Sequence, residues 1–257
     1  MHLLAIVNNK GGVGKTTSAV NLAAAFAEAG KTALLVDLDP AASASVHLGL
    51  DKSRGDHQTL CDYLLSDDGK LADYIYPTTF ENLWCVPSEP ALSEFYEEMM
   101  QEENLEFFLT RRDFPKKFDI ILMDSPPNMG NLAYNALAIA DALLIPVQTQ
   151  YLALTGLELT LKTVHKVQRH LNPKLQILGY FATHYDRRTN VAKEVLQRLR
   201  EQFGSAVFET VIGVNSKLIE AYGAQKPILS YASSARGAKE YRALAKEILE
   251  RLEKRGS

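Results

Sequence analysis

The segment from residue 9 to residue 17, which reads NKGGVGKTT, constrains this chain more than any other, because its glycines and lysines have the spacing of a phosphate-binding loop. The common form of that loop reads G-x-x-x-x-G-K-[ST]. Here Asn9 stands at the first position, and Lys10 is a second lysine five residues before Lys15. Backbone N–H groups of the loop and of the helix after it would bind phosphate oxygens. Lys15 would neutralise the β- and γ-phosphates, and the Thr16 hydroxyl would face Mg²⁺.

The segments on either side of this loop have the order that a phosphate-binding loop requires. Residues 3–7, LLAIV, form a short apolar run that suits a buried strand, and residues 16–29 form an alanine-rich helical stretch that ends at Gly30. A glycine-rich turn with chance lysines is the alternative. The order of strand, loop and helix favours the nucleotide-binding interpretation.

Two further apolar segments each end in aspartate. Residues 33–37, ALLVD, are followed by Asp39 and Pro40, and residues 118–124, FDIILMD, are followed by SPP. Carboxylates at the carboxyl edge of a parallel sheet suit magnesium, usually through water, so Thr16, Asp39 and Asp124 are the candidate metal-side residues. The alternative for both aspartates is a role as a helix N-cap, which Asp often fills.

Strands and helices are expected to alternate along the rest of the chain. Further strands are predicted at residues 83–86, 142–145 and 175–181, and helices at residues 156–170, 190–203 and 237–252. Parallel strands joined by helices imply a twisted, mostly parallel β-sheet with helices on both faces and ligands at its carboxyl edge. With 257 residues, 46% apolar content and no linker-like segment, the chain is expected to be one α/β domain over residues 1–257.

Five short segments together resemble one known family. They are KGGVGKTT at residues 10–17, DLDP at 37–40, DSPP at 124–127, YDRRTN at 185–190 and SARGA at 234–238. In this order and spacing they are similar to the ParA/MinD family of deviant Walker ATPases, and most of all to its ParA (Soj-like) branch, which partitions chromosomes and plasmids. The resemblance covers nearly the whole chain and implies the fold of a deviant P-loop NTPase.

The resemblance implies roles for individual residues. The ATP-binding residues would be Lys10, Gly11, Gly12, Val13, Gly14, Lys15, Thr16 and Thr17. Lys10 would reach across a nucleotide-sandwiched homodimer to the partner's phosphates and act there like an arginine finger. Asp39 would position the attacking water and Asp124 would be linked to Mg²⁺, so the catalytic residues would be Lys10, Lys15 and Asp39. Hydrolysis of ATP to ADP and phosphate would then depend on dimerisation.

Two positions depart from the family's pattern. After DLDP the family usually continues with Gln-Gly, whereas this chain has Ala41 and Ala42. An amide that orients switch or water contacts is therefore missing, which bears on the expected rate of hydrolysis. The arginine of the family's R-L-S-E-A segment is Lys217 here, so the charge is kept but the bidentate fork is lost.

Charge is unevenly distributed between two parts of the chain. Residues 1–150 carry 10 Lys and Arg against 21 Asp and Glu, and residues 151–257 carry 18 against 10, so their net charges are −11 and +8. Non-specific DNA binding depends largely on phosphate neutralisation, so the basic part is the candidate DNA-binding region. Charge and the family resemblance together select Arg187, Arg188, Lys193, Lys217 and Arg236. A solvated charged face is the alternative for each.

An acidic stretch that begins near residue 94 is a candidate surface for a protein partner. Glutamates and apolar residues are interleaved there, namely Glu94, Glu97, Glu98, Glu102, Glu103 and Glu106 with Leu92, Phe95, Met99 and Leu105. Such a helical surface would accept a basic peptide from a ParB-like adaptor, which stimulates hydrolysis in this family. A plain solvated helix is the alternative.

Cysteines and targeting signals exclude several classes of protein. Cys61 and Cys85 are the only cysteines and form no C-x-x-C pair, so neither a disulfide framework nor a zinc site is expected. Their positions do not match the cluster cysteines of the nitrogenase iron protein, which shares this loop type. No signal peptide or membrane-length apolar run is present, and residues 248–257 have mixed charge. The expectation is a cytoplasmic protein that does not bind membranes.

The motifs and the resemblance together imply an ATP-dependent homodimeric switch that binds DNA non-specifically, associates with the nucleoid and partitions or positions a cargo. The cargo would be a plasmid, a chromosome origin or a protein organelle such as a carboxysome, and the sequence does not decide among these. Two other classes stay open: a membrane-cycling positioning ATPase of the MinD type, and a metabolic P-loop enzyme such as an amide or ring synthase.

Overall fold

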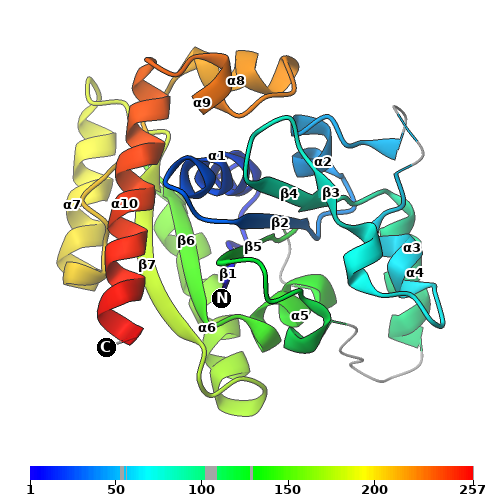
Figure 1. Cartoon of the computed structure of the whole chain (residues 1–257). Coiled ribbons are helices and arrows are strands. Elements are labelled where there is room, and N and C mark those ends of the chain that lie inside the picture. The colour runs from blue at the N-terminus through cyan, green and yellow to red at the C-terminus, as the bar shows by residue number, and fades with distance from the viewer. Residues whose placement is uncertain (53–54, 56, 102–108, 128–129, 257) are drawn as a thin grey trace.

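The computed structural model describes residues 1–257 except 53–54, 56, 102–108, 128–129 and 257. Its centre is a seven-stranded sheet with the order β3-β4-β2-β5-β1-β6-β7 (Figure 1). The strands are β1 (His2–Ile6), β2 (Ala33–Asp37), β3 (Tyr76–Pro77), β4 (Leu83–Val86), β5 (Ile120–Asp124), β6 (Ala142–Gln148) and β7 (Gln176–Thr183). Within this sheet the neighbouring strands are parallel, apart from the antiparallel pair of β3 and β4.

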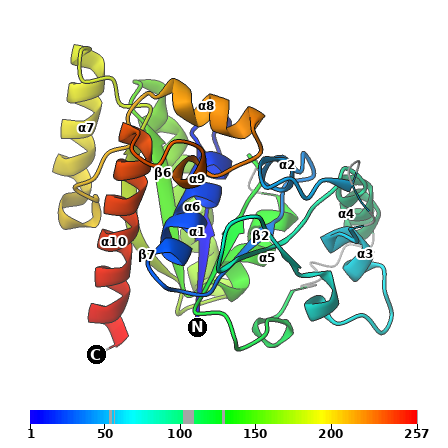
Figure 2. The same ribbon diagram turned by 45° about the horizontal axis from the view of Figure 1, so that its top comes forward.

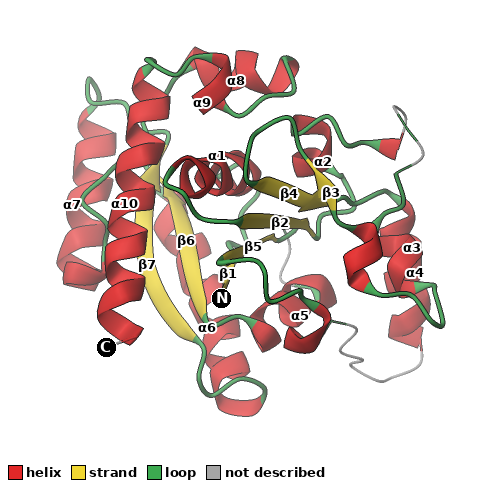
Figure 3. Cartoon of the chain, viewed as in Figure 1, coloured by secondary structure: helices red, strands yellow, loops and turns green. Residues whose placement is uncertain are grey.

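Helices connect the strands and enclose the sheet (Figure 3). The α-helices are α1 (Lys15–Glu28), α2 (Ser43–His47), α3 (Leu60–Leu64), α4 (Ala91–Gln101), α5 (Asn131–Ile139), α6 (Leu152–His170), α7 (Asn190–Phe203), α8 (Ser216–Gly223), α9 (Ile228–Tyr231) and α10 (Arg236–Gly256). Short 3₁₀ helices are η2 (Leu71–Tyr74), η3 (Arg111–Asp113) and η4 (Gly204–Ala206).

The sheet is buried on both faces, because successive residues of a strand point to opposite sides. In β1, Leu4 and Ile6 belong to one apolar core, and Leu3 and Ala5 belong to the other. The first core contains side chains of α1 and α10, which lie side by side in Figures 1 and 2, and the second contains side chains of α5 and α6. Strands buried on both faces require continuous apolar runs, which β1, β2 and β5 have.

The expected fold class is confirmed, and so are the expected strands and helices. The sequence pattern does not predict α2, α3, α5, α8 and α9, which have four to nine residues. Helices this short complete too few turns to show a helical period. Among the described residues, no helix is both long enough and apolar enough to span a bilayer.

The strand register gathers the predicted motifs at one edge of the sheet. Asp124, the last residue of β5, is paired with Ile6 of β1 on one side and with Asp37 of β2 on the other. The segments that follow these three strands therefore begin side by side. They contain the phosphate loop, the DLDP motif and the DSPP motif, as parallel topology requires.

Candidate functional site

The loop between β1 and α1 has the backbone of an anion-binding site. Gly12 and Gly14 have positive φ angles of 71° and 84°, which glycine adopts without the strain that a side chain would cause. Gly14 is the N-cap of α1, and no side chain in the described part of the chain caps this helix end. The first N–H groups of α1 are therefore available to an anion, which the positive end of the helix dipole also favours.

Lys15 is held inside this loop with only 6% of its surface exposed. Its Nζ donates to the carbonyl oxygens of Asn8 and Lys10, at 3.1 Å each. Burial lowers the pKa of Lys15, while the nearby carboxylates of Asp124 and Asp39 oppose that shift. The loop carbonyls thus keep the ammonium in place until a stronger acceptor, such as a phosphate oxygen, replaces them.

Lys10 lies on the outer side of the loop, next to α6. Its Nζ donates to Oε1 of Gln148 at 3.3 Å, and its backbone N–H donates to Oδ1 of Asn8 at 2.9 Å. A Cβ at Gly156 of α6 would lie 3.5 Å from the Cβ of Lys10, which is van der Waals contact, so α6 lies directly beside Lys10. Because Gln148 is a neutral amide, this contact leaves the positive charge of Lys10 uncompensated.

Asp124 is buried at the end of β5, and within the described residues neither of its carboxylate oxygens has a hydrogen-bond partner of acceptable geometry, although the Thr16 hydroxyl is near enough to affect its pKa. Burial is the main cause that raises the pKa of Asp124 well above its usual value. The carboxylate of Asp37 raises it further, while the Thr16 hydroxyl and Lys15 oppose the shift. Two buried acceptors without a donor are costly in a folded protein unless a ligand completes them. A hydrated Mg²⁺ ion between Asp124 and the Thr16 hydroxyl fits this requirement.

Asp37, which also ends a strand, has a different environment. Its Oδ2 accepts hydrogen bonds from the N–H and hydroxyl of Ser45, at 2.8 and 2.7 Å, and its Oδ1 accepts from the N–H of Asp39 at 3.1 Å. Burial raises the pKa of Asp37 to about 6, although these hydrogen bonds oppose the shift. Asp37 therefore fixes the start of α2 and shapes the loop that carries Asp39.

The loop after β2 carries Asp39 into the same cavity as Lys15 and Thr16. Asp39 is half-buried, and its Oδ1 accepts from the N–H of Ala41 at 3.0 Å. Ala42 follows with a positive φ of 51°, and it is the N-cap of α2. This conformation strains any residue with a Cβ, by roughly 1 kcal/mol or more. Ala42, which stands where the family usually has glycine, therefore places backbone strain beside the candidate catalytic carboxylate of Asp39.

These residues line a cavity of about 350 Å³. Its walls are Gly11, Gly12, Gly14, Lys15, Thr16, Thr17, Asp39, Ser43, His47, Pro127, His184 and Tyr222. The structure thus brings together the predicted residues of the phosphate loop with Asp39. Lys10 and Val13 are not part of this lining, and Asp124 lies buried beneath it, close enough to affect the pKa of Lys15.

A second cavity, of about 400 Å³, adjoins the first and shares Gly14, Thr17, His184 and Tyr222 with it. Its other walls are mainly apolar and come from the segment before α8, from α8 itself and from Tyr241 of α10. An anion-binding cavity that continues into an apolar one suits a nucleotide, which joins phosphates to a base.

Four wall residues of these cavities carry no signal in the sequence. His47 is buried, its ring packs edge-on against that of Tyr222 at 5.2 Å, and burial lowers its pKa to about 4. The hydroxyl of Thr183, at the end of β7, donates to the carbonyl of Val13 at 2.8 Å, and His184 follows with a positive φ of 51°. No motif marks these four positions, because their partners lie more than 150 residues away in the chain.

The candidate DNA-binding cations occupy connected segments. The N–H of Tyr185, just before Arg187, donates to the carbonyl of Ile212 at 3.0 Å, which joins this loop to the segment before α8. Three of the cations form ion pairs with carboxylates, namely Arg188 with Asp186, Lys217 with Glu220 and Arg236 with Glu240. Over the residues that the structure describes, Arg187 and Lys193 have no such partner, and both are exposed.

The acidic stretch is only partly described. It begins on α4, where Glu94 and Glu97 are exposed while Leu92 is buried and Phe95 is half-buried, so α4 packs one face against the protein. The predicted residues Glu102, Glu103, Leu105 and Glu106 lie outside the described residues, and the side chains of Glu98 and Met99 are not described either.

Comparison with known proteins identifies relatives along the whole chain. A model of the AAA domain family matches residues 1–177. The chain is 44% identical to the chromosome-partitioning ATPase Soj of Treponema pallidum, over 96% of this chain and 97% of that protein. It is 42% identical to the sporulation initiation inhibitor protein Soj of Bacillus subtilis, over 96% and 97%. Among solved structures, cobyrinic acid a,c-diamide synthase from Mycobacterium smegmatis, with bound ADP and magnesium, is 29% identical with a TM-score of 0.83 and covers 98% and 95%.

Proposed function

The chain belongs to the Soj/ParA family of partitioning ATPases, and on that premise we propose that it is an ATP-driven switch that dimerises, binds DNA non-specifically and partitions or positions a cargo. One observation carries this proposal. The loop that holds Lys10 and Lys15 lies beside Asp124, whose buried carboxylate has no hydrogen-bond partner of acceptable geometry among the described residues. A site with two lysines and an unsatisfied carboxylate fits a nucleoside triphosphate with its metal ion.

ATP and Mg²⁺ are the cofactors that the two adjoining cavities fit. The N–H groups at the start of α1 and the ammonium of Lys15 would hold the phosphates, and Thr16 and Asp124 would hold Mg²⁺, directly or through its water. The apolar cavity beside Tyr222 would hold the base. When bound, the metal ion neutralises charge on the β- and γ-phosphates.

Hydrolysis is assigned to Asp39 and Lys10. Asp39 lines the phosphate cavity and would orient the attacking water and accept its hydrogen bond. Lys10 lies outside the lining of its own cavity and hydrogen-bonds to a neutral amide. That placement supports a role on the phosphates of a second subunit, where its charge would stabilise the transition state.

The surface next to Lys10 supports a homodimer. Gly156 packs α6 against Lys10, and the first turn of α6 leaves Leu152 75% exposed, next to Tyr151 at 55%. Neighbouring large apolar side chains on a surface often mark a protein contact. A contact between two copies there would bring the two phosphate loops together.

DNA binding is assigned to the basic part of the chain, with Arg187 and Lys193 as its primary contacts. Both are exposed, and within the described residues neither has a carboxylate partner of the kind that Arg188, Lys217 and Arg236 have. The three paired cations would have to exchange a carboxylate for a phosphate, which reduces their net gain. A dimer doubles the cations that one DNA molecule meets, so ATP-dependent dimerisation would switch DNA affinity.

A basic peptide from a ParB-like adaptor would bind the exposed glutamates of α4, Glu94 and Glu97, and stimulate hydrolysis. Such a protein would work in the cytoplasm on the nucleoid. The cargo would be a plasmid, a chromosome origin or a protein organelle, and the adaptor would determine which.

The test is DNA binding by wild type and Lys10→Ala with ATP, with ADP and without nucleotide, with the molecular mass recorded by light scattering. Wild type should dimerise and bind DNA with ATP only. Lys10→Ala should still bind ATP but hydrolyse it more slowly by a factor on the order of 10² or more, by analogy with a removed arginine finger. Its ATP-dependent DNA binding should be lost.

Lys116→Ala is the matched control, because it removes an exposed lysine near the start of β5, at the opposite edge of the sheet. It should behave like wild type in every nucleotide state. Equal DNA affinity of the wild type with ATP, ADP and no nucleotide would contradict the switch.

A second candidate function is carboxylate amidation, which the likeness to cobyrinic acid a,c-diamide synthase favours. The apolar cavity next to the phosphate loop would then have to hold a carboxylate substrate beside the nucleotide. Release of ADP would require such a substrate and an amine donor. DNA-stimulated ADP release without any carboxylate substrate would decide for the partitioning function.

A further inference from the structure

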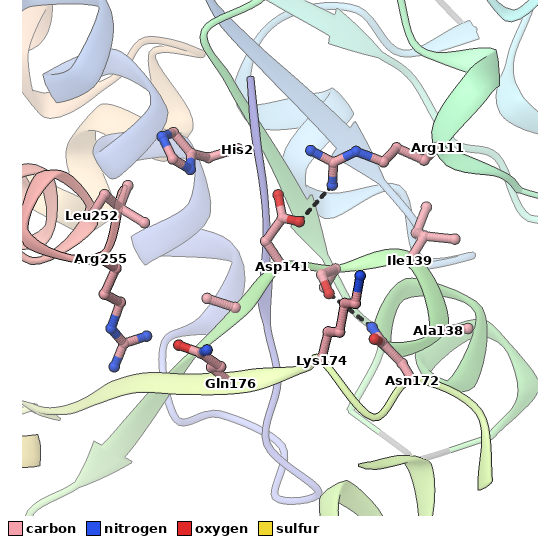
Figure 4. A pocket seen from close by; sticks show the side chains of 12 residues that line it. His2, Arg111, Ala138, Ile139, Asp141, Asn172, Lys174, Gln176, Leu252 and Arg255 are labelled. Carbon is pink, nitrogen blue, oxygen red and sulfur yellow. Dashed lines mark hydrogen bonds and ion pairs between the residues drawn. The ribbon is translucent and has the colours of Figure 1, made fainter. Parts of the chain in front are cut away.

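A third cavity, of about 450 Å³, lies at the amino edge of the sheet, at the opposite ends of β1 and β6 from the phosphate loop (Figure 4). Its walls come from the first residues of β1, β6 and β7, from η3, and from the C-terminal ends of α5 and α10. None of the nucleotide-site residues contributes to it. Its volume lies in the usual range for small-molecule sites, roughly 300 to 1,000 Å³.

Cationic side chains enter this cavity from different elements. Figure 4 shows Arg255 of α10 on one side, Arg111 on the other, and Lys174 between them near the start of β7. Lys174 and Arg255 are both exposed, and Arg255 donates through Nη2 to the carbonyl of Ile177 at 3.2 Å. In the described part of the chain, neither cation forms an ion pair.

The carboxylate in the lining is already occupied. Asp141 accepts from Nη1 of Arg111 at 2.5 Å through Oδ1 and from the N–H of Leu3 at 2.8 Å through Oδ2. Arg111 and Asp141 therefore neutralise each other. Lys174 and Arg255 remain as an excess of two positive charges, and no other Asp or Glu lines the described cavity.

The helix end that would repel an anion is covered. The C-terminus of α5 exposes carbonyl groups with partial negative charge. The side-chain amide of Asn172 donates to two of them, Leu137 O at 3.0 Å and Ala140 O at 2.8 Å. The electrostatic potential of the cavity is thus set mainly by the two uncompensated cations.

The rest of the lining combines two polar side chains, His2 and Gln176, with apolar ones. Ala138 and Ile139 form one wall, and Leu252 of α10 lies on the opposite side (Figure 4). We propose that this cavity binds a small organic phosphate, whose phosphate group contacts Lys174 and Arg255 and whose apolar part lies against Ile139 and Leu252. A phosphate monoester carries close to two negative charges at neutral pH, about −1.5 to −2, which matches the excess in the lining. The proposal does not depend on the function of the phosphate loop.

The probe is phenyl phosphate, which has one phosphate group and one apolar ring, titrated by calorimetry at low ionic strength. The wild type should bind it at the amino edge. Lys174→Gln/Arg255→Gln should bind it at least about tenfold more weakly, since both charged contacts are lost. Lys239→Gln/Lys246→Gln is the matched control, because it removes two exposed lysines of α10 outside this lining. It should retain wild-type affinity.

Further arms separate this site from the phosphate loop and test the ligand class. Lys15→Ala should keep the binding event, whereas loss of binding in Lys15→Ala but not in Lys174→Gln/Arg255→Gln would place the ligand in the loop and overturn the proposal. Equal weakening in both double variants would mean that the effect comes from general surface charge, and this would also overturn the proposal.

Inorganic phosphate and phenol should each bind more weakly than phenyl phosphate, and inorganic phosphate binding as tightly would overturn the apolar contact. Circular dichroism and thermal unfolding of each variant would confirm that it is folded.

Discussion

The two ends of β5 carry aspartates in opposite circumstances. Asp119, just before the strand, is exposed, and its Oδ2 accepts from both the N–H and the hydroxyl of Thr32 at 2.8 Å each. Asp124, the last residue of the strand, is buried, and no residue in the described part of the chain forms a hydrogen bond of acceptable geometry with it. The hydrogen bonds lower the pKa of Asp119, whereas burial raises that of Asp124. Four residues of β5, 120–123, lie between the carboxylate that is hydrogen-bonded and the one that is not.

The difference shows that polar groups are hydrogen-bonded within the protein at one edge of the sheet and left for a ligand at the other. At the amino edge, Asp119 and Asp141 join neighbouring segments through hydrogen bonds and so stabilise the fold. At the carboxyl edge, Asp124 is left incomplete and Ala42 is strained, which costs stability and leaves groups for a ligand to complete. The candidate nucleotide site therefore lies at the edge of the sheet where polar groups are left for a ligand to complete.

The largest expected effect comes from Asp124→Asn, which should lower ATP hydrolysis by about 10² to 10³ while leaving the ligand-free protein at least as stable. An amide avoids the cost of a buried charge, which outweighs the loss of the favourable interactions with the Thr16 hydroxyl and Lys15, because burial is the main influence on Asp124. Hydrolysis assays across Mg²⁺ concentrations and thermal unfolding without nucleotide would measure both effects. A large loss of stability without loss of hydrolysis would show that Asp124 stabilises the fold, as Asp119 does, and has no role in hydrolysis.

The pH dependence of stability should differ between wild type and Asp124→Asn. Because the folded-state pKa of Asp124 is raised above its unfolded value near 4, the folded protein holds this proton more tightly. Its contribution to the free energy of unfolding therefore falls as pH rises from about 4 towards the folded-state pKa, by at most about 1.4 kcal/mol per pH unit.

The measurable quantity is the difference between the two proteins, because other groups titrate in the same range. Asp37, with a pKa of about 6, contributes with the same sign, and His47, with a pKa of about 4, contributes with the opposite sign. Denaturant unfolding of the ligand-free proteins at several pH values would show Asp124→Asn gaining stability relative to wild type as pH rises. A constant difference would mean that folding does not change the pKa of Asp124.

Asp119→Ala tests the amino edge and should lower the free energy of unfolding by about 1 kcal/mol, through loss of its hydrogen bonds to Thr32. Hydrolysis per folded molecule should not change, because the residue lies at the edge away from the nucleotide. Asp67→Ala, at an exposed position, is the control and should stay within about 0.5 kcal/mol of wild type. A drop in hydrolysis for Asp119→Ala at full folding would show that the two edges are coupled.

The smallest expected effect concerns one backbone position at each edge. Ala42→Gly at the carboxyl edge should relieve the strain of φ 51° and stabilise the protein by about 0.5 to 1 kcal/mol, after the entropy cost of glycine. Gly30→Ala, between α1 and β2, should destabilise the protein by about 1 kcal/mol, because alanine is strained at the φ of 82° that Gly30 has. An added Cβ would meet no atom within 4 Å, so no packing contact would offset this strain. Denaturant unfolding of both variants checks the signs. If Ala42→Gly destabilises, the loop after β2 is not strained in the folded protein.

Much of the fold and part of the candidate site follow from local patterns in the sequence. The phosphate loop is contiguous over residues 9–17, so its glycines and lysines can be interpreted without knowledge of the fold. The apolar strands and the long helices are equally local. The sequence also places aspartates at the ends of β2 and β5, but it does not distinguish them. Only the structure shows that Ser45 donates two hydrogen bonds to Asp37, whereas no described residue makes a hydrogen bond of acceptable geometry to Asp124.

The same limit applies to the cations. From charge alone, Arg187, Arg188 and Lys193 are equivalent candidates for DNA contact. The structure separates them, because Asp186 lies at hydrogen-bond distance from Arg188 and binds it through two bonds, at 2.8 and 3.0 Å. Ion pairing depends on the side-chain geometry of a loop, which residue order does not specify.

The sequence by itself determined the phosphate loop, the order of strands and helices and the positions of the candidate metal-side aspartates, because each of these is encoded within a few turns or one strand of chain. Only the tertiary structure decided that His47 and Tyr222 close the nucleotide cavity, that Thr183 holds Val13, and that Lys174 and Arg255 share a cavity at the far edge of the sheet. The physical reason is distance along the chain. Side chains that are dozens to more than a hundred residues apart become neighbours only when the strands pair and the two apolar cores pack.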